Sequence, residues 1–305
     1  MSNGIAHFLR RHWGGAFASA VATAVAALFL LGYRPHVETA RCPEGLVAQG
    51  ARCCAPGQSL VGASCQGSPA TCPHGFTLYR TGCAVEPKKI EIAGGLLKNG
   101  PVDWQNANRA NGPTPIAPFL IDAFEVSVQS WEECASRGKC ASLPKAPNPT
   151  EPGHPVTRIT PAQAEAFCRQ SGGRLPSLQE WVWVASGAEE RRFPWGPNGL
   201  VCRRASFGLV AGPCAEGSGM PELSGARPDG QTPLGVADLA GNVAEWARAA
   251  DGRYRALGGS FRSRVAGELS VNAAFDGETP RDHIGFRCVY APEAPSPLLS
   301  NERTP

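Results

Sequence analysis

The chain has 305 residues, which is enough for one large domain with additional segments. Charged residues make up 18% of it and the formal net charge is only +3, so the sequence lacks the basic excess typical of nucleic-acid-binding proteins. We therefore expect no nucleic-acid partner. The 36 glycines and 28 prolines favour a loop-rich fold with short strands over a helical bundle.

The N-terminal region carries an apolar segment with the length of a membrane span. Residues 14–33 are uncharged, and Arg10 and Arg11 precede them. A helix of twenty residues spans roughly 30 Å, the thickness of one hydrocarbon core. The long apolar stretch lacks a convincing small-x-small cleavage site, which favours a retained signal anchor over residues 1–34; a cleaved signal sequence is the alternative. We expect attachment to the membrane through this helix, with the main domain periplasmic or extracellular.

Twelve cysteines in such a chain indicate an oxidising compartment. Six of them, in residues 41–86, form three repeats with the spacing C-x10-C: Cys42 to Cys53, Cys54 to Cys65 and Cys72 to Cys83. The repeats predict three small disulfide-closed hairpins, each stabilised by roughly 3 kcal/mol in the chain-entropy model. A zinc site is less favoured, because zinc sites use C-x2-4-C pairs. This segment is either a stalk or a small binding module, and its residues do not decide between the two.

Further along, capping signals predict three helices. Residues 119–126 alternate between apolar and polar positions and predict a strand, after which Ser127 can cap a helix. Thr160-Pro161-Ala162-Gln163 combines an N-cap, a proline at the first helical position and a capping-box glutamine, and this helix should end at Gly172-Gly173. Ser177 to Glu180 is a second capping box, opening a helix that ends near Gly187.

The remaining part of the chain gives weaker signals. After Gly187 the sequence predicts mostly turns until two strands, at residues 254–257 and 284–290. Local spacing predicts disulfides between Cys134 and Cys140 and between Cys202 and Cys214. Residues 292–305 are rich in proline, which predicts a disordered tail.

Three motifs in order carry a family resemblance. The sequence reads D-L-A-G-N-V-A-E-W at 238–246, G-G-S-F at 258–261 and I-G-F-R-C at 284–288, and G-R-L-P-S at 173–177 fits upstream. This order resembles the formylglycine-generating enzyme family, the sulfatase-modifying factors. The resemblance covers residues 88–291 and implies an α+β fold of the complex, C-type-lectin-like kind found in that family. It also implies a disulfide between Cys168 and Cys288, since the enzymes join the corresponding helix to the G-F-R-C strand.

The resemblance also shows what this chain lacks. The active enzymes oxidise a sulfatase cysteine with oxygen and copper(I), held by two cysteine thiolates that follow the G-G-S-aromatic segment. This chain has Ser263 and Glu268 at those two positions. Copper(I) is a soft ion that prefers thiolate, and hydroxyl and carboxylate oxygens are hard ligands. We therefore expect no copper and no copper-dependent formylglycine-generating activity.

A calcium site is the cofactor that the resemblance does imply. Asp238, Gly241, Val243 and Glu245 match the family's structural calcium positions, which use two side-chain oxygens and two main-chain carbonyls. Calcium needs several oxygen ligands from a sharply turned backbone, and Asp238-x-x-Gly241 supplies such a turn. In the alternative interpretation, Asp238 caps a helix and Glu245 is a solvent-facing helical residue.

Other candidates for chemistry are few. His283 is either a general base or a surface residue at the start of a strand. Four arginines could surround an anionic ligand or could pair with nearby acids such as Glu268, Asp276 and Asp282. They are Arg262, Arg264, Arg281 and Arg287.

Three functions fit these observations. The first is a membrane-anchored, extracytoplasmic binding or structural module, stabilised by calcium, with a protein or peptide ligand. The second is a periplasmic modifying enzyme, an oxidase or another chemistry, that acts on a protein or peptide. The third is a spacer or assembly element. A deep depression lined by Ser263, Glu268 and Arg287 with strongly shifted pKa values would favour the enzyme, and a shallow surface would favour binding.

Overall fold

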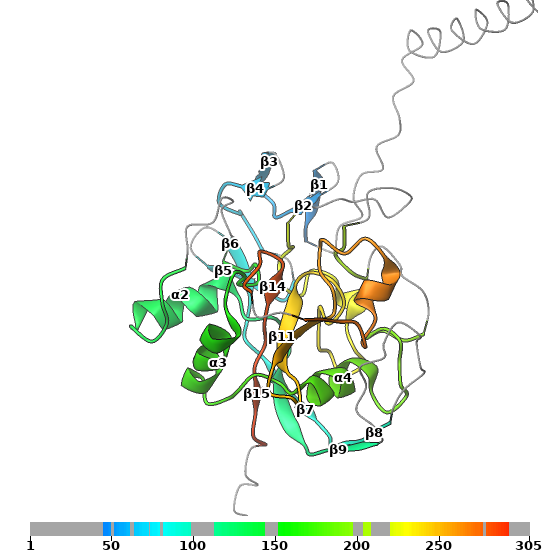
Figure 1. Ribbon diagram of the computed structural model, residues 1–305. Coiled ribbons are helices and arrows are strands. Elements are labelled where there is room, and N and C mark those ends of the chain that lie inside the picture. The colour runs from blue at the N-terminus through cyan, green and yellow to red at the C-terminus, as the bar shows by residue number, and fades with distance from the viewer. Residues whose placement is uncertain are drawn as a thin grey trace, which may run out of the picture. The chain divides into compact units, whose positions relative to one another are not determined.

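The computed structural model (Figure 1) describes ten ranges of the chain: residues 45–49, 52–61, 64–72, 74–79, 82–98, 113–143, 152–197, 204–208, 220–276 and 279–292. The predicted anchor over residues 1–34, the predicted Cys42–Cys53 and Cys202–Cys214 disulfides and the tail from residue 293 lie outside these ranges. Within them, no helix has the length and apolar character needed to cross a membrane.

Three antiparallel hairpins come first in the chain. They pair β1 (Val47–Gln49) with β2 (Arg52–Cys54), β3 (Ser59–Val61) with β4 (Ser64–Gln66), and β5 (Phe76–Tyr79) with β6 (Gly82–Val85). Disulfides join Cys54 to Cys65 and Cys72 to Cys83. Two of the three predicted C-x10-C pairings are therefore confirmed.

The third hairpin packs directly against the main domain. All four residues of β6 are buried. The backbone of Gly153 lies so close to the carbonyl of Cys83 that a Cβ atom at Gly153 would collide with it. The side chains of Val85 and Phe124 meet Gly225 on the other side of this contact.

Two sheets form the centre of the main domain. One is antiparallel and has the order β15 (Val289–Tyr290), β10 (Phe119–Asp122), β7 (Lys89–Ile92). The other has the order β13 (Ala274–Asp276), β12 (Tyr254–Leu257), β11 (Ala244–Arg248), β14 (Ile284–Gly285), in which only β11 and β14 are parallel. A separate hairpin pairs β8 (Gly95–Leu97) with β9 (Thr114–Ile116).

The C-terminal motif connects the two sheets. Residues 284–285 belong to the four-stranded sheet and residues 289–290 to the three-stranded one. Phe286, Arg287 and Cys288 lie between them and are fully buried. The single strand predicted over residues 284–290 is therefore two short strands. The strand predicted over 119–126 is also shorter, because it ends at Asp122.

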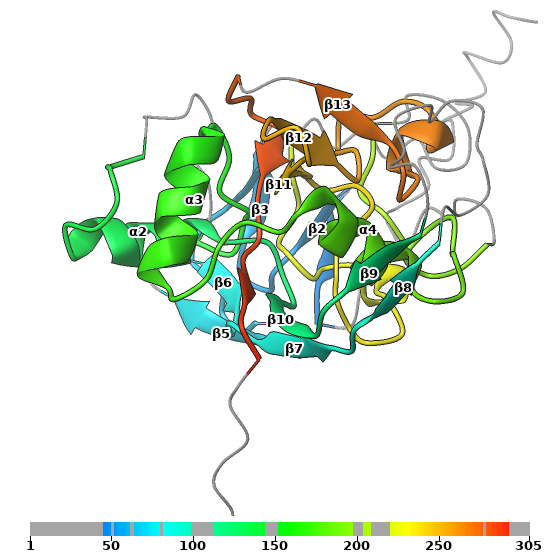
Figure 2. The ribbon, with the colours of Figure 1, turned by 60° about the horizontal axis from the view of Figure 1, so that its bottom comes forward.

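All three predicted helices are present, with the predicted caps. They are α2 (Val128–Ser136), α3 (Pro161–Gln170) and α4 (Leu178–Ser186), capped by Ser127, Thr160 and Ser177. Both capping boxes form. In Figure 2, α2 and α3 lie side by side, and α4 lies near β9. Two short 3-10 helices, Pro228–Gly230 and Ala266–Leu269, follow later in the chain.

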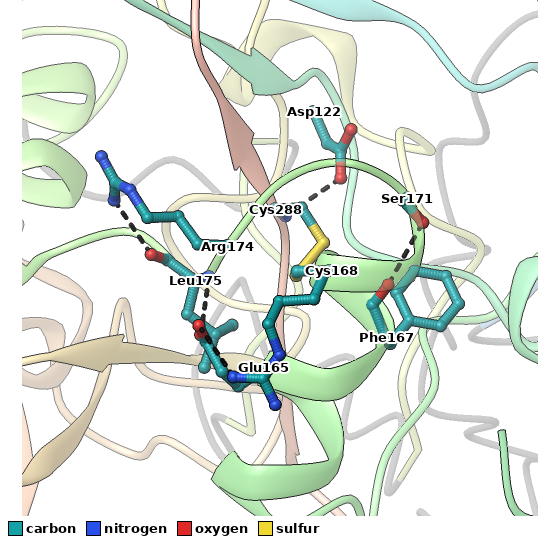
Figure 3. The surroundings of a disulfide bond; sticks show 9 residues. Asp122, Glu165, Phe167, Cys168, Ser171, Arg174, Leu175 and Cys288 are labelled. Carbon is teal, nitrogen blue, oxygen red and sulfur yellow. Dashed lines mark hydrogen bonds and ion pairs between the residues drawn. A yellow bond between two sulfur atoms is a disulfide. The ribbon is translucent and has the colours of Figure 1, made fainter. Parts of the chain in front are cut away.

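The packing of α2 and α3 is centred on aromatic side chains and two disulfides. The ring centroids of Trp131 and Phe167 are 5.5 Å apart, and Phe286 meets Phe167 edge-on at 5.5 Å. The disulfides Cys134–Cys140 and Cys168–Cys288 are both present, as predicted. Figure 3 shows the second of these, which ties α3 to the segment between the two sheets.

Candidate functional site

The D-L-A-G-N-V-A-E-W and G-F-R-C motifs meet in a buried ion pair. Glu245, on β11, is fully buried, as is Arg287. Arg287 donates from Nε to Glu245 Oε2 at 2.7 Å and from Nη2 to Oε1 at 2.5 Å. The indole of Trp181, on α4, donates to the same Oε2 at 2.7 Å. The alternative in which Glu245 is a solvent-facing helical residue is therefore wrong.

Arg287 fixes the backbone around it as well. Its guanidinium donates to the carbonyl oxygens of Asp122 and Ala123 at 3.1 and 3.2 Å and to that of Ala237 at 2.7 Å. Every contact of this side chain is thus internal. The prediction that Arg287 lines a surface depression is wrong, because the fold uses its charge to hold three chain segments together.

Two more carboxyl groups lie near this pair: Glu125 is buried and Asp238 is half-buried. Glu125 accepts hydrogen bonds from Ser224 Oγ and Asn242 Nδ2 at 2.8 and 2.7 Å. Burial, together with the negative charges of Asp238 and Glu245, raises the pKa of Glu125 well above its ordinary value. Burial also raises the pKa of Asp238 to about 6. Sequence reasoning assigned Glu125 no role, because its partners Asn242 and Val243 lie 117 and 118 positions further along the chain.

The predicted sharp turn at Asp238 and Gly241 is present. Asp238, Gly241 and Asn242 all have positive φ, at 57°, 93° and 53°. The carboxylate of Asp238 accepts a hydrogen bond from the backbone N–H of Gly225 at 2.5 Å. Gly241 lies against the backbone of Ser206, where a Cβ atom would clash. The hydroxyl of Ser206 is buried and has no hydrogen-bond partner among the described residues.

The donor set at this turn fits the chemistry of calcium in part. When Glu125, Asp238 and Glu245 are all ionised, their three negative charges exceed the one positive charge of Arg287 by two. The oxygens available there are hard ligands. Glu245, however, already holds Arg287 and Trp181. Within the described ranges, no group of three or more His, Cys, Asp or Glu residues is arranged as a metal site. Calcium at Asp238, Gly241, Val243 and Glu245 stays a prediction.

Ser263 and Glu268, the residues expected at the copper-thiolate positions, line one cavity, which we call the Ser263 cavity. Its volume is about 320 Å³. Its polar lining residues are Ser260, Arg262, Ser263, Glu268, Thr279, Arg281 and His283, and its apolar part includes Ala244, Trp246, Ala256, Phe275 and Ile284. Of the residues that the sequence named for a depression, Ser263 and Glu268 line this cavity and Arg287 does not. Three further candidates from the sequence, Arg262, Arg281 and His283, line it as well.

Ser263 and Glu268 are held by backbone contacts. The hydroxyl of Ser263 accepts a hydrogen bond from the N–H of Ser260 at 3.0 Å, and Glu268 accepts one from the N–H of Arg264 at 3.2 Å. Gly259 has a φ of 66°, and a Cβ atom there would lie 2.8 Å from the Ser263 hydroxyl. The tight G-G-S-F turn therefore shapes this wall of the cavity.

His283 enters the Ser263 cavity with a carboxylate partner. Its Nδ1 lies 3.0 Å from Asp282 Oδ1, and its side chain is 26% exposed. Asp282 also accepts two hydrogen bonds from Arg262, at 3.1 and 2.6 Å. Pairing of Arg262 with a nearby acid, one of the two alternatives for the arginines, is thus observed. Asp282 was missed as a partner of His283, although it is adjacent in sequence.

Comparison with known proteins places these motifs in a family. The model of the sulfatase-modifying factor enzyme 1-like domain matches residues 76–292, most of the chain. This chain belongs to that family. The match includes the third hairpin, which is the one whose second strand is buried against the main domain.

Individual relatives differ in their named activity. The inactive C-alpha-formylglycine-generating enzyme 2 of Mus musculus is 26% identical over 74% of this chain and 91% of that protein. The hercynine oxygenase of Mycolicibacterium thermoresistibile is 29% identical over 42% of this chain and 27% of that protein. Several other curated relatives are covered over only about half of their length, for example 50% and 58%.

Solved structures show the same fold. PvdO from Pseudomonas aeruginosa matches with a TM-score of 0.54 and 16% identity, over 68% of this chain and 95% of that one. The sulfatase-modifying factor fold, with mixed short helices and sheets and with disulfides, is therefore the fold of this protein. At this identity the likeness concerns the fold alone.

Proposed function

We propose that this protein is a membrane-anchored, extracytoplasmic binding module of the sulfatase-modifying factor family, and that its Ser263 cavity takes a protein or peptide ligand. The observation that carries the proposal is the position of Ser263 and Glu268 in one cavity, where the copper thiolates of the active enzymes would be expected. A hydroxyl and a carboxylate do not replace two thiolates as ligands of copper(I).

Two further observations support binding over catalysis. The groups with raised pKa values, Asp122, Glu125, Asp238 and Tyr290, do not line the Ser263 cavity. In addition, the relative from Mus musculus, which this chain matches over 91% of its length, is named inactive. The exposed side chain of Phe275 and the polar groups around it suit an amphipathic peptide segment.

The membrane anchor and the calcium ion belong to the same proposal. The uncharged residues 14–33 after two arginines support an anchor, and the disulfides support a compartment outside the cytoplasm. The turn at Asp238 and the two excess negative charges around it support a structural calcium ion.

A modifying enzyme is the second candidate, and His283 is the observation in its favour. A carboxylate at Nδ1 holds one imidazole nitrogen, which leaves the other for proton transfer in the cavity. In this alternative His283 is the general base and Asp282 is its positioning residue.

The deciding experiment combines metal analysis, turnover and binding on the full-length, disulfide-oxidised chain. We expect no stoichiometric copper after copper(I) loading and no oxidation of a sulfatase-motif peptide. We also expect that a peptide selected from a random display library for binding to this chain binds the Ser263→Trp variant at least tenfold more weakly. Peptide turnover that is lost in His283→Gln would overturn the binding module in favour of the enzyme.

A further inference from the structure

A second and larger cavity lies away from the Ser263 cavity, where the third hairpin meets α2 and α3. Its volume is about 520 Å³, which is within the usual range of small-molecule sites. It is lined by residues from β6, β7, β10, α2, α3 and β15. No residue of this cavity also lines the Ser263 cavity.

Basic side chains gather at this cavity, which we call the lysine cavity. The whole chain has only five lysines among its 29 basic residues, and three of the five line this one cavity. Arg137 adds a fourth cation. The four are Lys88, Lys89, Arg137 and Lys139. Most of the lysines therefore lie at one place, although the net charge of the whole chain is only +3.

The acidic side chains of the cavity are already engaged. Asp122 accepts hydrogen bonds from the N–H of Cys288 at 3.0 Å and from the hydroxyl of Tyr290. Glu133 accepts one from Gln129 at 3.0 Å, and Glu125 belongs to the buried network around Arg287. Figure 3 shows Asp122 beside the Cys168–Cys288 disulfide, with its carboxylate directed at the backbone of Cys288.

Lys89 lies opposite Asp122 and interacts with its carboxylate, but the other three cations have no ion-pair partner among the described residues. Lys88, Arg137 and Lys139 form no ion pair with any residue in the described part of the chain. Lys89 lies 3.6 Å from the ring centroid of Tyr290 and makes a cation–π contact. Three exposed cations at the edge of the cavity, Lys88, Arg137 and Lys139, are therefore without an ion pair in the described part of the chain.

A disulfide and a strand pairing hold the cations of the lysine cavity in place. The Cys134–Cys140 disulfide closes the turn after α2 that carries Arg137 and Lys139. Lys89 is fixed opposite Asp122 in the pairing of β7 with β10. The apolar part of the same lining includes Val85, Phe124, Val126 and Phe167.

We propose that the lysine cavity binds a small organic anion, whose charged group contacts the lysines and Arg137 and whose apolar body lies against Phe124 and Phe167. The site is independent of the Ser263 cavity and of the function proposed for it. Because the cations are exposed, binding is expected to weaken as salt screens their charge.

The test uses naphthalene-2-sulfonate as the anionic probe and naphthalene-2-sulfonamide as its neutral counterpart. Calorimetric titration of the full-length oxidised chain is expected to show binding of the sulfonate at least tenfold tighter than that of the sulfonamide. The double variant Lys88→Ala/Lys139→Ala should weaken sulfonate binding about tenfold, since each partly exposed charge contributes a few-fold. These side chains are exposed, so melting curves should stay unchanged.

Lys98→Ala is the matched control, because Lys98 is an exposed lysine outside the cavity. It should leave the affinity within twofold of that of the unmodified chain. The proposal is overturned if the neutral probe binds equally well, if Lys98→Ala weakens binding as much as the double variant, or if no sulfonate binding occurs at millimolar concentration. Loss of binding in Ser263→Trp would also overturn it, since that would place the probe in the other cavity.

Discussion

Replacing Glu245 by glutamine is expected to destabilise the fold strongly, because it removes the charge of the carboxylate that accepts two hydrogen bonds from the buried guanidinium of Arg287. Both side chains are fully buried and share two hydrogen bonds, at 2.7 and 2.5 Å. Breaking a buried ion pair by removing one partner's charge costs about 3–5 kcal/mol. For a domain of this size, each kcal/mol lowers the melting temperature by about 2–4 °C, so the expected decrease is about 6–20 °C.

The chain provides a matched control for this substitution. Glu180 accepts two hydrogen bonds from Arg174, at 2.7 and 2.6 Å, but Arg174 is 51% exposed. Glutamine can still complete the capping box with Ser177. Glu180→Gln should therefore cost less than about 1 kcal/mol. Thermal and urea unfolding of the oxidised chain measure both values, and equal losses for the two variants would refute the reasoning about burial.

Two further predictions concern charge. Burial raises the pKa of Asp122 from 3.8 to about 6, so its contribution to stability is complete below pH 4 and is lost as pH rises through 6. Between pH 4 and 7, the free energy of unfolding measured in urea should therefore fall by about 3 kcal/mol less in Asp122→Asn than in the unmodified chain. An equal fall in the two chains would contradict this. Calcium should raise the melting temperature, because a hundredfold excess over its dissociation constant adds about 2.7 kcal/mol to the free energy of unfolding. Asp238→Ala should remove this rise. A melting curve that chelator leaves unchanged would argue against the calcium site.

The sequence predicted the helices well because their signals are local. Each capping residue and its partner lie within three positions, as with Thr160 and Gln163 or Ser177 and Glu180, so a short window contains the complete interaction. The disulfides Cys54–Cys65 and Cys134–Cys140 were also predictable from local spacing. Cys168–Cys288 spans 120 positions, and only the family resemblance indicated it.

The strands were harder to predict, since their pairing is not local. β11 was missed entirely, although it holds Glu245 and Trp246 at the centre of the four-stranded sheet. Its residues Ala244–Arg248 are almost all buried, so the alternation that marks a half-buried strand is absent. Residues 284–290, in contrast, were predicted as one strand although they form two. Apart from Arg287 these residues carry no charge, but the segment passes from one sheet to the other.

In the candidate site, too, local contacts were predictable from the sequence and long-range contacts were not. Ser263 and Glu268 were placed correctly in one cavity, since a short turn from Gly259 determines where both lie. Arg287 was assigned to that cavity as one of four arginines that could surround an anionic ligand. Its actual partner, Glu245, is 42 positions earlier, and only the parallel pairing of β11 with β14 brings the two segments together. An arginine in a conspicuous motif can thus be structural.

The negative charges buried around Asp238 are the physical basis of the calcium prediction. In the sequence, Asp238 and Glu245 are two acids that suit a cation, and the fold supplies one cation of its own in Arg287. It also adds a third acid, Glu125, so that two negative charges remain uncompensated when all three carboxyl groups are ionised. Buried charges of this kind are neutralised either by protons, as the raised pKa of Asp238 indicates, or by a bound cation. Because a single divalent ion would balance the cluster, the response of the melting temperature to calcium decides between these two states.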